Sequence, residues 1–216
     1  MTSINVDQTC TTEPVTITVT CGCQSVEPEP PAAAPRLSEL DLHGYTCATV
    51  LPPYITRTAR VAAALFGVSA VLPAGASIAS VGVAVANPAI GDAFTESRLG
   101  VYVGGIPELV AKSDHKANLY TFGGWRWAPL NKTVTPADED RVIWLVAQIP
   151  LFSSSQPDFA AAGGDASSLL NGSRYRSVIV KEAVELPPMF DGDAVPFTPR
   201  GDLIAMAATD YGVVQP

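Results

Sequence analysis

The chain has 216 residues, of which 47% are hydrophobic and only 16% are charged. This low charge density argues against disorder along most of the length, and the chain is long enough to bury one sizeable core. The formal net charge is −8, with acidic and basic residues interspersed. No basic stripe is present to neutralise a phosphate backbone, so we expect no nucleic-acid partner.

The N-terminal segment predicts an extended anchoring arm. It lacks both the positive start and the apolar run of a secretion signal, so we expect no export signal. Val15, Ile17 and Val19 alternate with threonines, which is the pattern of a half-buried strand. A lone strand is not stable by itself, so we expect this assembly strand to add to a sheet edge of a neighbouring subunit.

A proline-rich spacer follows the predicted strand. Residues 26–35 read V-E-P-E-P-P-A-A-A-P, a composition typical of an extended, semi-rigid linker. We therefore expect an arm with its spacer over residues 1–35 and a folded domain over residues 36–216.

Short apolar runs separated by turn signals recur after Pro53. The turns include Asn87-Pro88 and Gly123-Gly124. Many short strands between such turns predict an all-β fold, an antiparallel β-sandwich of the jelly-roll type with an extended N-terminal arm. The predicted strands cover residues 60–71, 77–86, 99–103, 119–122, 142–149, 175–180 and 203–208.

Alternation within the runs indicates which side chains face the core. Val81, Val83 and Val85 share one face of their strand, as a pleated strand requires. Residues 142–147 are apolar throughout, so we expect a central strand covered on both faces, with Trp144 in the core.

Three segments have compositions that are compatible with a helix or a membrane span as well as with strands or loops. Residues 61–85 carry no charge and resemble a membrane span in hydropathy, but Pro73 and several glycines interrupt them, so we expect strands and no membrane insertion. Residues 59–65 and 158–170 have some helical character. The first has no cap and the second contains Gly163-Gly164, so we expect a strand and a long loop respectively.

The order of several sequence blocks resembles a β-sandwich found in tail fibres and minor tail proteins of bacteriophages. The blocks are P-A-G-A-S-I-A-S-V-G-V-A-V at 73–85, R-L-G-V-Y-V at 98–103, G-W-R-W-A-P-L at 124–130, T-V-T-P-A-D at 133–138 and R-V-I-W-L-V at 141–146. The resemblance covers about residues 56–212. The group often carries an aspartate after the second block, whereas this chain has Gly104-Gly105.

The resemblance implies a non-enzymatic structural virion protein, at the tail or its tip, that serves assembly and host adhesion. It implies assembly in the host cytoplasm and a final place on the exterior of the phage particle. The expected partners are other virion proteins, further copies of the chain and a host surface carbohydrate. A capsid decoration protein and a carbohydrate-binding module of a larger enzyme system are the alternatives.

The cysteines all precede the predicted sandwich. Cys21, Cys23, His43 and Cys47, with Cys10 as a further thiolate, are candidate zinc ligands. A C-x-C pair is a poorer chelate than C-x-x-C, so free thiols are favoured, and a disulfide remains open. We expect no cofactor.

The sequence predicts no catalytic residues. His43 and His115 are the two histidines, and Asp114-His115 is not accompanied by a G-x-S-x-G motif. The acidic groups at residues 138–140 and 191–193 could bind calcium but lack the spacing of a calcium loop, so solvated turns are the favoured interpretation.

Three aromatic residues, Tyr120, Trp125 and Trp127, flank the Gly123-Gly124 pair. The two tryptophans would share one face of an extended segment. On an exposed face the three rings would form a sugar-stacking platform, and on a buried face they would belong to the core, which is the interpretation we favour.

Overall fold

The computed structural model divides the chain into two units, residues 1–36 and 37–216. It describes residue 40 and residues 43–104, 107–163, 177–181, 185–189, 198–199 and 202–212, all in the second unit. The predicted arm and spacer lie outside the described residues, and so do Val15, Ile17, Val19, Cys10, Cys21 and Cys23.

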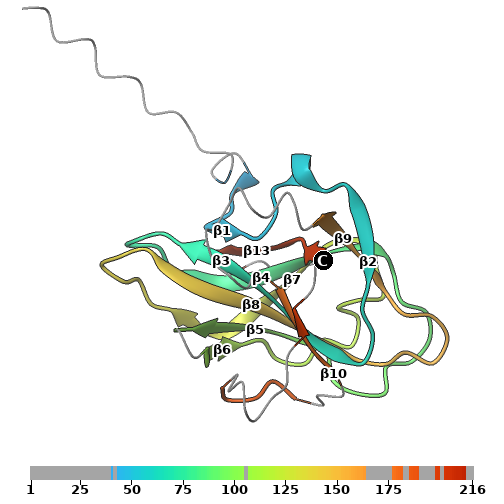
Figure 1. Ribbon diagram of the computed structural model, residues 1–216. Coiled ribbons are helices and arrows are strands. Elements are labelled where there is room, and N and C mark those ends of the chain that lie inside the picture. Colours follow the sequence, from blue (N-terminus) through green and yellow to red (C-terminus); the bar gives the residue numbers. More distant parts are fainter. Residues whose placement is uncertain are drawn as a thin grey trace, which may run out of the picture. The chain divides into compact units, whose positions relative to one another are not determined.

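The predicted all-β, antiparallel fold is confirmed (Figure 1). A single-turn 3-10 helix, η1 (Pro52–Tyr54), accompanies the strands. The strands are β1 (Cys47–Ala48), β2 (Arg57–Arg60), β3 (Ala64–Leu72), β4 (Ile78–Asn87), β5 (Arg98–Val103), β6 (Glu108–Lys112), β7 (Gly124–Val134), β8 (Arg141–Ile149), β9 (Asp158–Gly163), β10 (Ser177–Lys181), β11 (Thr198–Pro199), β12 (Asp202–Ile204) and β13 (Met206–Thr209).

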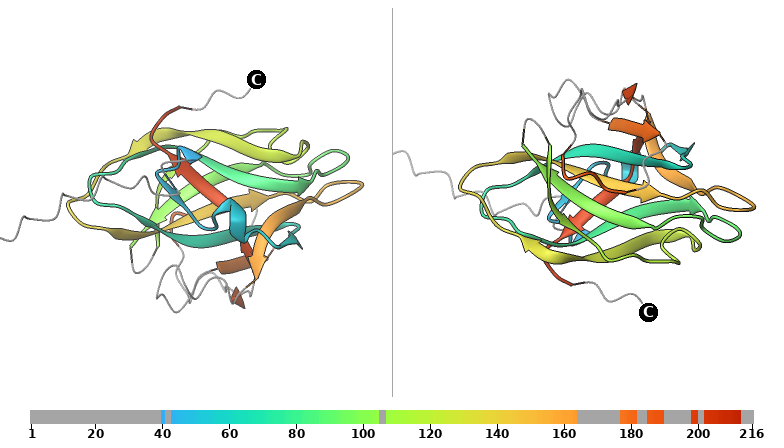
Figure 2. Two further views of the ribbon diagram at one scale, coloured as in Figure 1. Left: turned by 90° about the horizontal axis from the view of Figure 1, so that it is seen from above. Right: turned by 90° about the horizontal axis from the view of Figure 1, so that it is seen from below.

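The strands form two sheets that lie in two layers (Figure 2). Sheet A has seven strands in the order β1-β13-β4-β9-β12, with β2 paired to β9 and β7 paired to β4. Sheet B has six strands in the order β11-β10-β3-β8-β5-β6. Ser113, directly after β6, forms an isolated bridge to Leu130 within β7, so the two sheets approach each other along that side.

The core lies between the sheets and follows the predicted alternation. Val81, Val83 and Val85 of β4 are at most 2% exposed, and they face Phe66 and the other inward side chains of sheet B. Burial of each such valine contributes about 1.5–3 kcal/mol. Phe159 of β9 completes this layer by packing in a T-shaped arrangement with the ring of the buried Tyr120. The inner face is therefore apolar and closed.

Residues 61–85 form β3 and β4, which lie in different sheets. The turn between the two strands includes Gly75 at φ +74°, a left-handed conformation that favours glycine. Within the part of the chain that the structure describes, no helix is long and apolar enough to cross a membrane.

Some predicted elements are wrong. Residues 119–122 form turns and not a strand. Leu119 and Tyr120 lie in a loop whose side chains reach into the core, so a short apolar run here does not mean a strand. Residues 158–163 form strand β9, where a loop was expected, and residues 164–170 lie outside the described residues. Residues 59–65 are split between two strands, since Ala63 takes a positive φ of 46°.

Strand β8 is an interior strand of sheet B, as expected, but Trp144 is not in the core. Ile143 and Leu145 face the core, whereas Trp144 is half-buried and packs on the opposite, outer face of the sheet. A strand that is apolar throughout gives no period from which to assign its faces. The outer face is covered by a distant segment, residues 185–189, whose contribution the local sequence does not reveal.

Candidate ligand-binding surface

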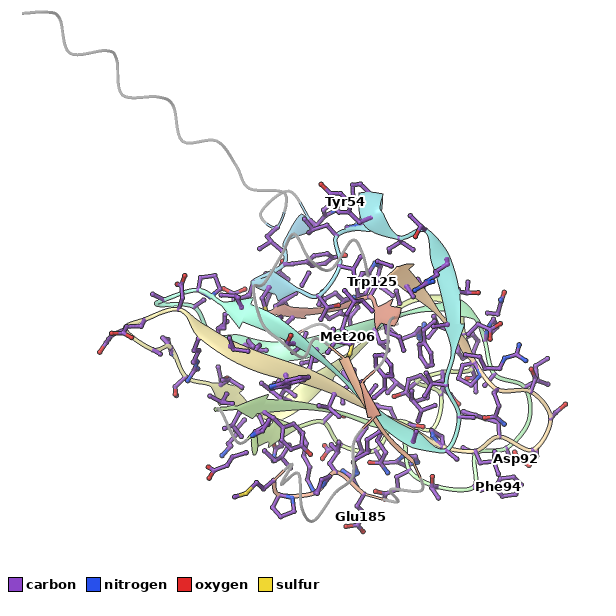
Figure 3. The ribbon with its side chains drawn as sticks, viewed as in Figure 1. Tyr54, Asp92, Phe94, Trp125, Glu185 and Met206 are labelled. Carbon is purple, nitrogen blue, oxygen red and sulfur yellow. The ribbon has the colours of Figure 1, made fainter. Side chains whose placement is uncertain are left out.

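Trp125 and Trp127 lie on the outer face of sheet A, the face turned away from sheet B. They pair across β4 with Ala84 and Gly82, which alternate with the buried valines. A Cβ placed on Gly82 would lie 2.6–2.9 Å from three ring atoms of Trp127, so this ring rests directly on the glycine. The two tryptophans are half-buried, and their ring centroids are 5.7 Å apart with 24° between the planes. The side chain of Trp125 is labelled among the side chains drawn in Figure 3.

The segment before β1 adds two further rings to the tryptophan pair. Tyr45 lies 5.4 Å from Trp125 and 5.9 Å from Trp127, measured between ring centroids, and is tilted against both. His43 stacks on Tyr45 with 5.6 Å between centroids and 22° between planes. We call the group of His43, Tyr45, Trp125 and Trp127 the aromatic surface.

A pocket of about 240 Å³ adjoins the aromatic surface at Tyr45; it is lined by Gly44, Tyr45, Thr46, Asp210 and Tyr211. We call it the tyrosine pocket. The Tyr211 hydroxyl donates a hydrogen bond of 2.6 Å to the carbonyl of Gly44, whose φ of +67° turns the chain there. Burial first, and then the electrostatic effect of the neighbouring Tyr211, raise the pKa of Tyr45, so the Tyr45 hydroxyl keeps its proton at neutral pH.

The structure brings together two of the three residues of the predicted platform. Trp125 and Trp127 share a half-exposed face, but Tyr120 is fully buried and its hydroxyl donates a 2.9 Å hydrogen bond to the Gln148 carbonyl. The favoured interpretation, that the three rings belong to the core, is therefore confirmed for Tyr120 and wrong for the two half-buried tryptophans. Tyr45, which contacts both tryptophans, was missed, and so were His43 and Tyr211 beside it. Only the pairing of β1, β13, β4 and β7 brings these distant segments together.

The candidate zinc ligands that are described do not form a metal site. The Cys47 thiol is free, 1% exposed and on the core side of β1, and burial raises its pKa to about 12. Among the described residues no three His, Cys, Asp or Glu side chains are close enough to hold a metal ion. His43 stacks on Tyr45 instead, and Cys21 and Cys23 lie outside the described residues.

His115 borders a second pocket, of about 270 Å³, at the end of the sandwich. Its Nδ1 accepts a 3.0 Å hydrogen bond from the backbone N–H of Ser97, and the Ser97 side chain is fully buried. Ser97 therefore offers no nucleophile to this pocket.

The acidic residues at 138–140 lie in a loop that contacts the turn after β3, since Asp140 accepts a hydrogen bond of 2.8 Å from the Ala74 N–H. Residues 191–193 lie outside the described residues.

Comparison with protein-family models, curated proteins and solved structures finds no match to this chain. The function therefore has to be inferred from the residues of the chain itself. Its most distinctive surface feature is a row of half-exposed aromatic rings beside a polar pocket, an arrangement suited to binding a ligand.

Proposed function

We propose that the chain is a structural protein of a bacteriophage virion, at the tail or its tip, which acts by assembly and host adhesion and not by catalysis. The observation that supports this most is the order of the sequence blocks that resemble phage tail sandwiches. Four of these blocks overlap strands β4, β5, β7 and β8, and the block at 133–138 covers the end of β7 and the start of the loop after it.

The adhesion part of the proposal is supported by the aromatic surface. Half-exposed tryptophan and tyrosine rings on a sheet face are costly to leave in water, and such patches are characteristic of binding sites. A rigid sandwich holds these rings in fixed positions, so little conformational entropy would be lost when a ligand binds. A virion protein with this surface would present it to the host.

Immunogold electron microscopy tests the proposal. An antibody raised against the full chain is applied to particles released from the cells that encode it. Label at the tail or its tip is the expected result. Label over the head would favour the alternative of a capsid decoration protein. Particles without label would overturn a virion role.

A further inference from the structure

We propose that the aromatic surface and the tyrosine pocket together bind a pyranose ring of a surface carbohydrate. This deepens the proposed adhesion function and rests on it. The two tests have separate readouts, because a labelled tail without carbohydrate binding would reject only the carbohydrate site.

The geometry of the rings suits the flat face of a sugar. A pyranose presents axial C–H groups on its faces, and these pack favourably on an aromatic π face. Trp125 and Trp127 are held nearly parallel along β7, and Trp127 is fixed from below by the backbone of Gly82. Tyr45, tilted against both, closes one side. The site is therefore pre-organised, which reduces the entropic cost of binding.

The polar groups beside the rings suit a sugar better than a proline-rich peptide, the other ligand class that aromatic surfaces accept. The tyrosine pocket includes the Asp210 carboxylate, which can only accept hydrogen bonds. Sugar hydroxyls can donate to it. Prolines have no N–H, so a polyproline segment could not itself donate a hydrogen bond to this carboxylate.

The size of the tyrosine pocket fits one sugar residue. Its volume of about 240 Å³ is below the roughly 300–1,000 Å³ of pockets that enclose drug-sized ligands. A single ring would therefore occupy the pocket, and the next residue of an oligosaccharide would lie over the tryptophans.

Hydrogen bonds, in addition to the ring contacts, hold the segment that carries Tyr45. The Tyr45 N–H donates a 2.9 Å hydrogen bond to Leu40, and the Thr46 N–H donates one of 2.8 Å to Ala208. The Tyr211 hydroxyl adds its bond to Gly44. Because these hydrogen bonds hold the segment in place, ligand binding would not have to order it.

Calorimetric titration of the full chain with cellohexaose, an N-acetylglucosamine hexamer and maltohexaose tests the site. Saturable binding of at least one hexasaccharide is expected. Trp125→Ala and Trp127→Ala should each weaken it about tenfold or more, because each removes a stacking face. Trp125→Phe should retain part of the affinity, since it keeps an aromatic ring. Asp210→Asn should weaken binding by loss of a charged acceptor.

Trp144→Ala is the matched control, because it removes a half-buried tryptophan from the opposite sheet. It should leave the affinity unchanged. The proposal is overturned if none of the three hexasaccharides binds, or if Trp125→Ala and Trp127→Ala bind as the parent does. It is also overturned if a proline decamer binds through these tryptophans in place of the sugars. If Trp125→Ala does not fold, Trp125→Phe and Asp210→Asn decide the question.

Discussion

The two outer faces of the sandwich differ in how they are covered. On sheet B, Leu65, Tyr102 and Val146 are buried beneath Leu186, which comes from a segment distant in sequence. The Tyr102 hydroxyl donates a 2.8 Å hydrogen bond to the Pro187 carbonyl and thereby fixes this cover. On sheet A the side chains over the strands are aromatic rings that remain half-exposed.

Both faces use a glycine to bring a large side chain close to the sheet. A Cβ on Gly100 would lie 3.1 Å from a methyl carbon of Leu186, and one on Gly82 would lie 2.6 Å from the Trp127 ring. The difference lies in what covers each face. An aliphatic side chain and prolines close sheet B, whereas rings with polar edges beside a pocket leave sheet A able to bind a ligand.

The largest change in the free energy of unfolding is expected on the outer face of sheet B, which Leu186 covers and which we call the closed face. Leu186→Ala should lower the free energy of unfolding by about 2–5 kcal/mol, because the side chain is 6% exposed and its loss leaves a cavity over Tyr102. Urea denaturation measures this change. Met189→Ala, at a residue 37% exposed in the same segment, should stay within about 0.5 kcal/mol of the parent. Equal stability of Leu186→Ala and the parent would mean that this face is open.

A smaller effect is expected from filling the space under Trp127. Gly82→Ala should cost about 1–3 kcal/mol, because the new methyl group displaces the ring. Tryptophan fluorescence should shift to longer wavelength as the ring becomes more exposed. In Gly82→Ala/Trp127→Ala the clash is absent, so the double variant should lose less stability than the sum of the single variants. Strict additivity would contradict the contact.

The hydroxyl that fixes the closed face should matter more than the one on the open face. Tyr102→Phe should lower stability by about 0.5–1.5 kcal/mol, since the partly buried Pro187 carbonyl loses its donor. Tyr211→Phe removes a hydroxyl from a residue 53% exposed, and it should change stability by less than about 0.5 kcal/mol. Thermal unfolding of both variants makes the comparison, and the reverse order would refute it.

The smallest signal is the reactivity of Cys47, which reports on the opening of β1 beside the aromatic surface. With its pKa raised by burial to about 12, the folded thiol is about one part in ten thousand thiolate at pH 8. An unfolded thiol loses its proton near pH 8.5, so Cys47 should lower stability as the pH rises above about 9. Mass spectrometry after iodoacetamide treatment should find Cys47 unmodified in the native protein and modified in urea. Rapid native alkylation would show that β1 opens readily.

Alternating residues allowed much of the fold to be predicted. The period of Val81, Val83 and Val85 assigned the core face of β4, and the spacing of Trp125 and Trp127 placed both rings on one face. Prediction failed where no period exists. The uniform apolar run around Trp144 predicted the strand but gave no indication of which side faces the core, and the short run containing Tyr120 gave no indication that it forms turns.

The rest of the candidate surface could not be predicted because it depends on long-range pairing. Tyr45 reaches the tryptophans, and Tyr211 reaches the pocket beside Tyr45, only through the β1–β13–β4–β7 arrangement. The one local signal was His43-x-Tyr45, two rings two residues apart, which could have been interpreted as a second aromatic face.

Photochemically induced nuclear polarisation, which marks only the aromatic rings that a dye in solvent can touch, tests the contrast between the two faces most directly. We expect polarised signals from His43, Tyr45, Trp125, Trp127 and Tyr211. We expect none from Tyr102 or Tyr120, which are 0% exposed. Silent Trp125 and Trp127, together with a polarised Tyr102, would contradict the assignment of an open face to sheet A and a closed face to sheet B.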